Sequence, residues 1–319
     1  MREYIVKRLL LLIPTLFLVS VLIFTLMRIV PGDYALLVAA GGEGSLNDPT
    51  VYEGLRQQFG LDKPLVVQYS DWVWRMVRYA DLGVSFRSSR PVLGEILSSL
   101  AVTLELAIGA TIVSLVIAIP TGVISAIRQD TGADYMARII GLAGLSAPGF
   151  WIGTLLLIFP AFLWGYLPTL GYVSPLDNLG KNIEQFIFPS LALGASFAAR
   201  VMRMTRSQML EVLRQDYIRT AWSKGLRERG VLAHHALKNA LIPVVTIVGV
   251  DFGYLLGRTV VIEAVFVLPG LGSSTLKAIN LRDYPQVQGN ILFIALMFVL
   301  VNLAVDLAYA WIDPRIRYG

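Results

Sequence analysis

Six long apolar runs, separated by short polar segments, constrain this chain more than any other feature. A helix needs about 20 apolar residues to cross the roughly 30 Å hydrocarbon layer of a bilayer. Runs of that length lie near 9–30, 101–126, 139–164, 186–206, 240–262 and 290–311. The first run is too long for a signal peptide and no A-x-A site closely follows it, so we expect it to be retained as a span. Only 15% of the residues are charged, against about a quarter in soluble domains. The pattern predicts an all-α polytopic membrane protein with six transmembrane helices.

The distribution of positive charge predicts how these spans are oriented. Most of the 27 Lys and Arg residues fall in or beside four segments, which are the amino terminus, 127–138, 207–239 and the carboxyl tail. Positive charge collects on the cytoplasmic side of membrane proteins. We therefore expect both termini in the cytoplasm and 31–100 outside it. The sequence pI of about 9.4 then reflects a basic inner face, which suits anionic lipids and acidic proteins.

The segment 31–100 is long enough to have structure of its own. Pro64 is followed by apolar residues at helical spacing, and proline is favoured at the start of a helix. The sequence therefore predicts a small extracytoplasmic cap. Its aromatic residues Trp72, Trp74 and Tyr79 fit either anchors at the membrane interface or contacts with a substrate. The predicted organisation is 1–30 as the amino terminus and first span, 31–100 as the cap, and 101–319 as a five-helix core.

A basic amphipathic segment lies between the fourth and fifth spans. Its apolar residues recur at helical spacing, as Tyr217, Ile218, Ala221, Trp222, Gly225 and Leu226. The polar residues fall on the other face, as Asp216, Arg219, Thr220, Ser223, Lys224 and Arg227. A helix of this kind rests its apolar face on a membrane or a helix bundle and shows its charges to a soluble partner. We predict that this partner is a protein.

Three spans carry small residues four positions apart, the spacing that lets helix backbones approach closely. They are the pairs Gly149 and Gly153, Ala195 and Ala199, and the triple Gly249, Gly253 and Gly257. These faces predict packing either within the chain or against a second membrane subunit.

Charged residues are rare within the predicted spans, where they include Glu105, Asp251 and Asp306. Asp251 is followed by Tyr254 and Arg258 at i+3 and i+7. A carboxylate at this depth is costly unless it faces protein or water. Asp251 therefore either lines a translocation pathway with Tyr254 and Arg258, or pairs with a polar neighbour.

The sequence argues against catalysis and against a metal site. It has no cysteine, and its only histidines, His234 and His235, are adjacent and so lack the i, i+4 spacing of helical metal ligands. They also fall on the predicted cytoplasmic side, whereas the candidate nucleophiles Ser273 and Ser274 fall on the outer side. There is no G-x-x-x-x-G-K-[ST] motif. We expect a chain that is not an enzyme and binds no cofactor, so any ATP that drives it is hydrolysed elsewhere.

Several motifs in order resemble one family of membrane proteins along essentially the whole chain. They are MRIVPGD, FGLDKPLVVQY, DLGVSF, DYIRTAWSKGL, HALKNALIP and VIEAVFVLPGLG. The chain resembles the permease subunits of bacterial ABC importers for dipeptides, oligopeptides and, in some members, nickel. Specifically, it resembles the subunit in which one span precedes a long extracytoplasmic loop. The resemblance implies the helical permease fold called MetI-like.

In this family the segment corresponding to 207–239 is the EAA-type coupling loop, which docks on an ATPase subunit. Arg219, Thr220 and Ala221 occupy the E-A-A places, Gly225 the motif glycine, and His235, Ala236, Leu237 and Lys238 the I-x-L-P places. Only Ala221, Gly225 and Leu237 keep the general letters. The resemblance extends the coupling site to a larger set, namely Asp216, Arg219, Thr220, Ala221, Lys224, Gly225, Leu226, Arg227, His235 and Leu237.

The resemblance also implies partners and a mechanism. The partners are a second permease subunit, two ATPase subunits that hold ATP and Mg, and an extracytoplasmic binding protein that delivers a peptide. The mechanism is alternating access in the inner membrane. A nickel importer of the same family remains an alternative. A secondary transporter is another, but it would need buried ionisable relays and usually an inverted repeat, and neither is evident in the sequence.

Overall fold

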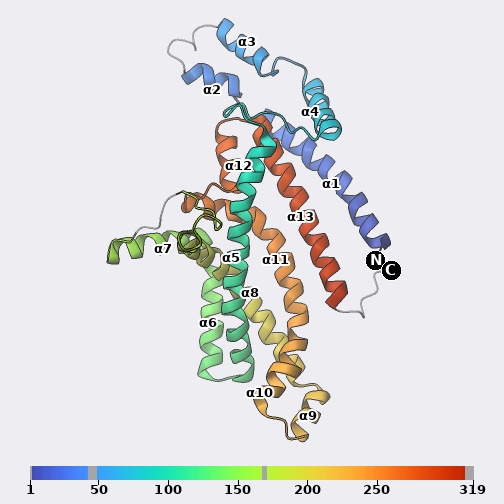
Figure 1. The fold of residues 1–319 in the computed structure, drawn as a ribbon, viewed down its shortest axis with the longest axis vertical. Coiled ribbons are helices and arrows are strands. Elements are labelled where there is room, and N and C mark those ends of the chain that lie inside the picture. The colour runs from blue at the N-terminus through green and yellow to red at the C-terminus, as the bar shows by residue number, and fades with distance from the viewer. Residues whose placement is uncertain (1, 42–48, 167–170, 313–319) are drawn as a thin grey trace. The chain divides into compact units, whose positions relative to one another are not determined.

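The computed structural model describes residues 2–41, 49–166 and 171–312, which are almost entirely helical (Figure 1). The all-α prediction is therefore confirmed. The chain divides into two compact units. The core unit comprises Thr103–Leu268 and the stretch from Leu300 onward, and the N-terminal unit comprises Arg2–Val102 and Pro269–Val299. Residues 269–299, which the sequence analysis grouped with the five-helix core, thus cluster with the N-terminal residues.

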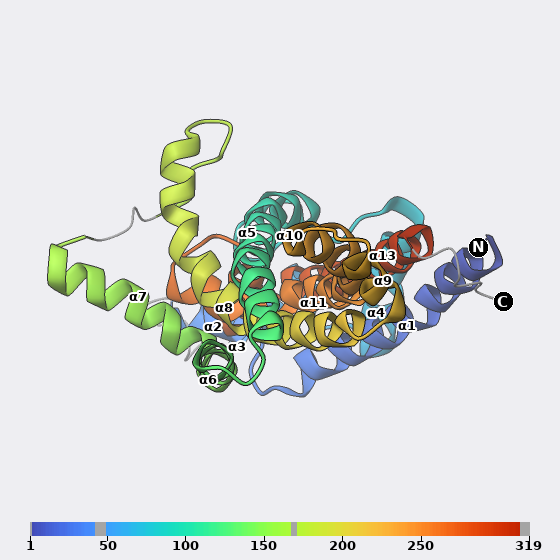
Figure 2. The ribbon, with the colours of Figure 1, turned by 90° about the horizontal axis from the view of Figure 1, so that it is seen from below.

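The core unit is built around α8 (Leu179–Leu213), which packs against α6, α7 and α11 (Figure 1, Figure 2). Its other elements, in chain order, are the second part of α5 (Val92–Ile127), α6 (Gly132–Ser146), α7 (Gly149–Trp164), α9 (Asp216–Ser223), α10 (Glu228–Gly230), the π-helical segment η2 (Val231–Leu237), α11 (Lys238–Val265) and the end of α13 (Tyr284–Ile312). Fifteen residues of α8 are buried, more than half of them apolar. Such a helix lies at the centre of a bundle.

The prediction of a single helix over 139–164 is wrong. The run forms two helices, because the helical conformation is interrupted between α6 and α7. Ala147 is extended, with φ −81° and ψ 126°, and Pro148 follows it. Proline disfavours a helical conformation in the residue before it and cannot donate a backbone hydrogen bond. The apolar run is continuous in sequence, but Pro148 ends one helix and begins another.

Glycines bring α5 and α8 close together in the core unit. A Cβ at Gly122 would lie 2.8 Å from the carbonyl oxygen of Met202, and one at Gly194 would lie 2.6 Å from that of Ala110. Real Cβ atoms essentially never approach other atoms this closely. The two helices therefore need glycine at both places, and neither glycine belongs to the small-residue pairs identified in the sequence.

The N-terminal unit contains α1 (Arg2–Ile29), α2 (Tyr34–Gly41), α3 (Pro49–Gln58), α4 (Leu65–Tyr79), the start of α5, α12 (Leu271–Asn280) and the first part of α13. Helix α4 follows Pro64, as predicted. Its residues Tyr69 and Trp72 are half-buried, whereas Trp74 and Tyr79 are 64% and 70% exposed.

A buried carboxylate ties two distant parts of the N-terminal unit together. Asp283, just before α13, accepts hydrogen bonds from Ser85 Oγ at 2.6 Å, Phe86 N at 3.1 Å and Arg87 N at 3.3 Å. A carboxylate that accepts several hydrogen bonds replaces the water it loses on burial. The loop at 85–87 is thereby fixed to the junction between α12 and α13.

Five stretches among the described residues are long and apolar enough to cross a membrane, which are Ile5–Ala39, Val92–Ile127, Leu179–Leu213, Glu228–Val265 and Tyr284–Leu307. Four of the six predicted spans fall within these stretches, and 290–311 overlaps the last of them. The remaining one, 139–164, covers the second half of α6 and the whole of α7, a shorter apolar helix of 16 residues. The chain is thus a multi-pass membrane protein.

Candidate functional site

The segment from α9 to η2 forms a compact helical turn at one end of the core unit (Figure 1). We call residues 216–237 the coupling segment. Helix α9 follows α8 after only two residues, and Gly225 then adopts φ +75° before α10 begins. A side chain is strained at such a positive φ, and glycine is not. The chain therefore makes a tight bend at Gly225, the glycine of the EAA-type pattern.

Two apolar residues hold α9 against the core unit. Ile218 is fully buried and Ala221 is 7% exposed, and they belong to a cluster with Ala126 at the end of α5 and Met209 near the end of α8. From η2 and α11, the cluster also includes Val231, Ala236 and Ala240. The coupling segment thus rests directly on the ends of two long helices.

The buried face of α9 is narrower than the apolar face predicted from the sequence. Tyr217, Trp222 and Leu226 are 44%, 43% and 47% exposed. Ile218 and Ala221 lie three residues apart and so share one face, whereas Tyr217 and Trp222 lie about 70° from the middle of that face, one on either side. Helix α9 therefore buries only Ile218 and Ala221, which lie in the middle of the predicted apolar face. The rings of Tyr217 and Trp222 therefore flank an exposed polar face.

Most of the predicted coupling residues are exposed. These are Asp216, Arg219, Thr220, Lys224, Gly225, Leu226, Arg227 and His235, whereas Ala221 is buried and Leu237 is half-buried. Arg219 and Asp216 approach to 3.6 Å, with their side chains 72% and 97% exposed. An ion pair as exposed as this contributes little to stability. Both charges are therefore accessible to a partner.

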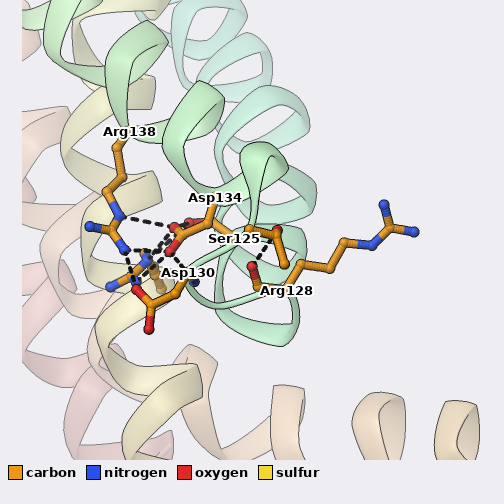
Figure 3. Close-up of polar contacts among 7 residues, drawn as sticks. Ser125, Arg128, Asp130, Asp134 and Arg138 are labelled. Carbon is orange, nitrogen blue, oxygen red and sulfur yellow. Dashed lines mark hydrogen bonds and ion pairs between the residues drawn. The ribbon is translucent and has the colours of Figure 1, made fainter.

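A second cluster, which was not predicted from the sequence, is centred on Asp134 (Figure 3). We call Asp134 with Ser125, Arg138 and Arg206 the Asp134 clamp. The carboxylate is fully buried and accepts from Arg138 Nε at 3.0 Å and from Arg206 Nε and Nη2, both at 2.9 Å. The Ser125 hydroxyl donates at 2.5 Å. The clamp thereby joins α5, α6 and α8.

The clamp holds Asp134 in its ionised form. Hydrogen bonds from Arg138, and next from Arg206, hold the pKa of the Asp134 carboxyl well below its usual range. The guanidinium of Arg138 has its pKa raised, chiefly by its hydrogen bond to Asp134. Charge-assisted bonds of this kind are stronger than those between neutral groups.

The clamp and the coupling segment contact the same two helix ends, those of α5 and α8. Ser125 precedes Ala126, and Arg206 lies about one helical turn before Met209. Ala126 and Met209 are the residues of α5 and α8 on which Ile218 and Ala221 pack. A force applied to α9 therefore acts on helix ends that the clamp holds together.

Asp251 lies in α11, and its Oδ1 accepts from Arg200 Nη1 of α8 at 2.5 Å. The Asp251 side chain is 5% exposed and that of Arg200 is 37% exposed. Asp251 therefore has a polar neighbour, one of the two alternatives that the sequence left open. Tyr254 is 50% exposed and Arg258 is also exposed. The pathway role of these three residues stays a prediction.

The three glycines of α11 have different surroundings. A Cβ at Gly249 would lie 2.6 Å from Val305 of α13, and Gly253 is buried. Gly257 is exposed, and its Cβ would meet nothing within 4 Å. Gly249 thus permits packing within the chain, whereas the surface at Gly257 is open.

Comparisons with known proteins agree with this architecture. The model of the family described as "Binding-protein-dependent transport system inner membrane component" matches residues 118–318. A companion model for the N-terminal part of such membrane components matches residues 1–107. Both parts of the chain are thus covered by models of the same transport system.

Similar proteins of full length carry related names. The glutathione transport system permease protein GsiC of Escherichia coli O6:H1 is 43% identical over 318 residues, with 100% of each chain covered. A putative peptide transport system permease protein of Brucella abortus is 42% identical with the same coverage.

A solved structure shares the fold at low sequence identity. A chain of the MetNI methionine ABC transporter, in an inward-facing conformation, has a TM-score of 0.53 and is 16% identical. The match covers 69% of this chain and 97% of that one. Its likeness supports the predicted permease fold. The chain belongs to the family of binding-protein-dependent transport system inner membrane components, the non-catalytic permease subunits of ABC importers.

Proposed function

We propose that the chain imports short peptides, and that its coupling segment receives the movement of an ATPase subunit. The observation that carries the proposal is the geometry of α9. Ile218 and Ala221 anchor it on the ends of α5 and α8, while Arg219, Lys224 and the neighbouring rings are exposed. A surface of charges with adjacent aromatic rings is suited to a protein contact, in which charge sets the register and aromatic area contributes affinity.

The proposed assembly contains a second permease subunit, two ATPase subunits with ATP and Mg, and an extracytoplasmic binding protein. Both termini and the coupling segment lie in the cytoplasm. The 31–100 segment receives the peptide, and the core unit alternates between outward and inward access. Asp251, Tyr254 and Arg258 line part of the pathway. The open surface at Gly257 lies where a second membrane subunit packs.

Peptides are the proposed substrates because similar full-length proteins are named for glutathione and peptide transport. Glutathione is itself a tripeptide and is the first probe. The test is uptake of labelled glutathione and of a second tripeptide into proteoliposomes that contain the full assembly. We expect uptake that requires ATP, this chain and the binding protein.

Two variants connect uptake to the coupling segment. Arg219→Glu reverses an exposed charge of α9, and Arg229→Glu is its matched control outside the proposed contact residues. We expect Arg219→Glu to abolish peptide-stimulated ATP hydrolysis and Arg229→Glu to retain most of it. Uptake driven by an ion gradient without ATP would instead indicate a secondary transporter. Uptake of nickel but not of peptide would indicate a nickel importer of the same family.

A further inference from the structure

Helix α4 has an apolar side that the described residues of the N-terminal unit leave uncovered. None of its 15 residues is buried. Val66, Trp74 and Val77 are 79%, 64% and 74% exposed. At about 100° per residue, these three side chains point within about 80° of one another around the helix. A contiguous exposed apolar surface of this kind marks an interaction site.

Two other sides of α4 have different characters. Tyr69 and Trp72 are half-buried, and their rings lie against that of Phe24 in α1, with centroid distances of 5.1 and 6.4 Å. Arg75 and Arg78 are exposed and lie three residues apart, so they share a basic side. A helix with an apolar side and a basic side is typical of one that lies in the plane of a membrane interface.

Contacts with α1 show which way these sides of α4 face. Tyr69 Oη lies 2.8 Å from Ser20 Oγ, in a hydrogen bond. Gln68 Oε1 accepts from Arg28 Nε and Nη2 at 3.2 and 3.0 Å. Ser20 precedes Arg28 by eight residues, which is about 12 Å along α1. Helix α4 therefore crosses α1, with its Tyr69 side towards the middle of α1 and its Gln68 side towards the end of α1.

The apolar side of α4 is the one that faces the middle of α1. Around the axis of α4, Val66 and Val77 lie within about 80° of Tyr69. Arg75 instead lies within about 20° of Gln68. Helix α1 belongs to a stretch that is long and apolar enough to cross a membrane. The apolar side of α4 therefore faces the interior of the membrane, and the basic side faces its surface.

Two features favour lipid over protein as the neighbour of this apolar side. Phe17 lies three residues before Ser20 and is 56% exposed, so the apolar surface of α1 continues past its contact with α4. The single acid of α4, Asp71, pairs with Lys63 at 3.2 Å. The two arginines of α4 thus give its outer side a positive charge, which suits the phosphates of lipid headgroups.

We infer that α4 lies in the membrane interface, with Val66, Trp74 and Val77 among the acyl chains of the lipids and with Arg75 and Arg78 at their headgroups. A helix in this position buries its apolar side about 5–10 Å into the boundary between headgroups and acyl chains. The N-terminal unit is then attached to the bilayer by α4 as well as by its membrane-spanning helices. The inference needs only that α1 crosses the membrane, and it holds whatever solute the chain carries.

Single cysteines can report the surroundings of each side, because the chain has no cysteine of its own. Val66→Cys and Val77→Cys place a nitroxide spin label on the apolar side. Arg75→Cys and Arg78→Cys are matched controls on the basic side of the same helix. Phe17→Cys on α1 is the reference for a label in lipid. All five positions are exposed, so a label at any of them disturbs no buried contact.

The experiment is electron paramagnetic resonance of each labelled chain, assembled with cysteine-free partner subunits in phospholipid nanodiscs. It measures how often the nitroxide collides with oxygen, which concentrates in hydrocarbon, and with chromium oxalate, which stays in water. We expect the ratio of oxygen to chromium collisions to be several-fold higher for Val66→Cys and Val77→Cys than for Arg75→Cys and Arg78→Cys. The two apolar positions should approach the ratio of Phe17→Cys.

Two outcomes would overturn the inference. Few collisions with either reagent at Val66→Cys and Val77→Cys would show that another protein covers the apolar side. The same ratio on both sides of α4 would show that the helix lies wholly in water or wholly in hydrocarbon. Two positions on each side ensure that a local effect of one label does not decide the result.

Discussion

Replacing Asp134 by Asn tests whether the Asp134 clamp holds the adjoining ends of α5, α6 and α8 together. The change keeps the shape of the side chain but removes the charge that two guanidinium groups share. Arg206, with 19% of its side chain exposed, would then be left largely buried without a counterion. We therefore expect a substantial loss of stability.

The burial of the ion pair determines how much unfolding free energy the change removes. Removing one partner of a buried ion pair costs about 3–5 kcal/mol. The lower end applies, because the Arg138 side chain is 38% exposed and water partly compensates its charge. We predict a loss of about 3 kcal/mol, or about two orders of magnitude in the folding equilibrium, since each tenfold change is about 1.4 kcal/mol.

The assay is the unfolding free energy of the purified subunit in mixed micelles, measured by titration with a denaturing detergent. Asp130→Asn is the control, because Asp130 contacts Arg138 at 3.4 Å with its side chain 65% exposed. An exposed pair contributes at most about 1 kcal/mol. Arg206→Gln combined with Asp134→Asn should cost less than the sum of the two single changes, because the residues share one interaction.

The pH dependence has a definite sign. The pKa of Asp134 is lowered in the folded chain, so the stabilisation is fully present above the pKa of an unfolded Asp, about 3.9. It is lost as the pH falls below that value towards the folded pKa. We expect a constant difference between wild type and Asp134→Asn from pH 5 to 8, within about 0.5 kcal/mol, and a shrinking one below about pH 4. A loss for Asp134→Asn no larger than that for Asp130→Asn would show that the clamp does not stabilise the fold.

Three further predictions concern other parts of the chain. Gly225→Val should uncouple ATP hydrolysis from uptake, whereas Gly230→Val should not. Neither Cβ would meet an atom within 4 Å, and only Gly225 has a positive φ. Equal effects of the two changes on ATP hydrolysis and on uptake would show that the bend at Gly225 is not needed for coupling. Gly249→Leu should destabilise the purified subunit by forcing Val305 away, whereas Gly257→Leu should leave it folded and weaken only its association with the proposed second permease, as followed by size-exclusion chromatography. In intact cells, an impermeant thiol reagent should label Ser88→Cys and spare Ser223→Cys, in a chain that has no cysteine of its own; the reverse pattern would invert the orientation.

Features determined by neighbouring residues could be predicted from the sequence. Pro64 precedes α4, and Gly225 makes the bend, because a proline or a glycine acts on its own backbone. The length and polarity of the apolar runs likewise predicted the long helices. Hydropathy predicted one helix over 139–164, because it does not show that Pro148 interrupts the run completely.

Features that depend on distant residues could not be predicted. Asp134 pairs with Arg206, which lies 72 residues away, and Asp251 pairs with Arg200, 51 residues away. The i, i+4 spacing of Asp134 and Arg138 was the one local sign of the clamp. The exposure of Tyr217 and Trp222 was missed because helical spacing shows which residues share a face, whereas the width of the contact depends on what packs against it.

Cross-linking can show directly whether the coupling segment touches the ATPase. Ser223 is exposed at the end of α9, and a cysteine placed there can carry a short photo-cross-linker. We predict that Ser223→Cys cross-links to the ATPase subunit in the purified importer and that the yield changes when ATP is added. A cross-linker on Ser88→Cys should give no ATPase product. If Ser223→Cys gives none while the complex hydrolyses ATP and imports peptide, the coupling segment is not the contact with the ATPase.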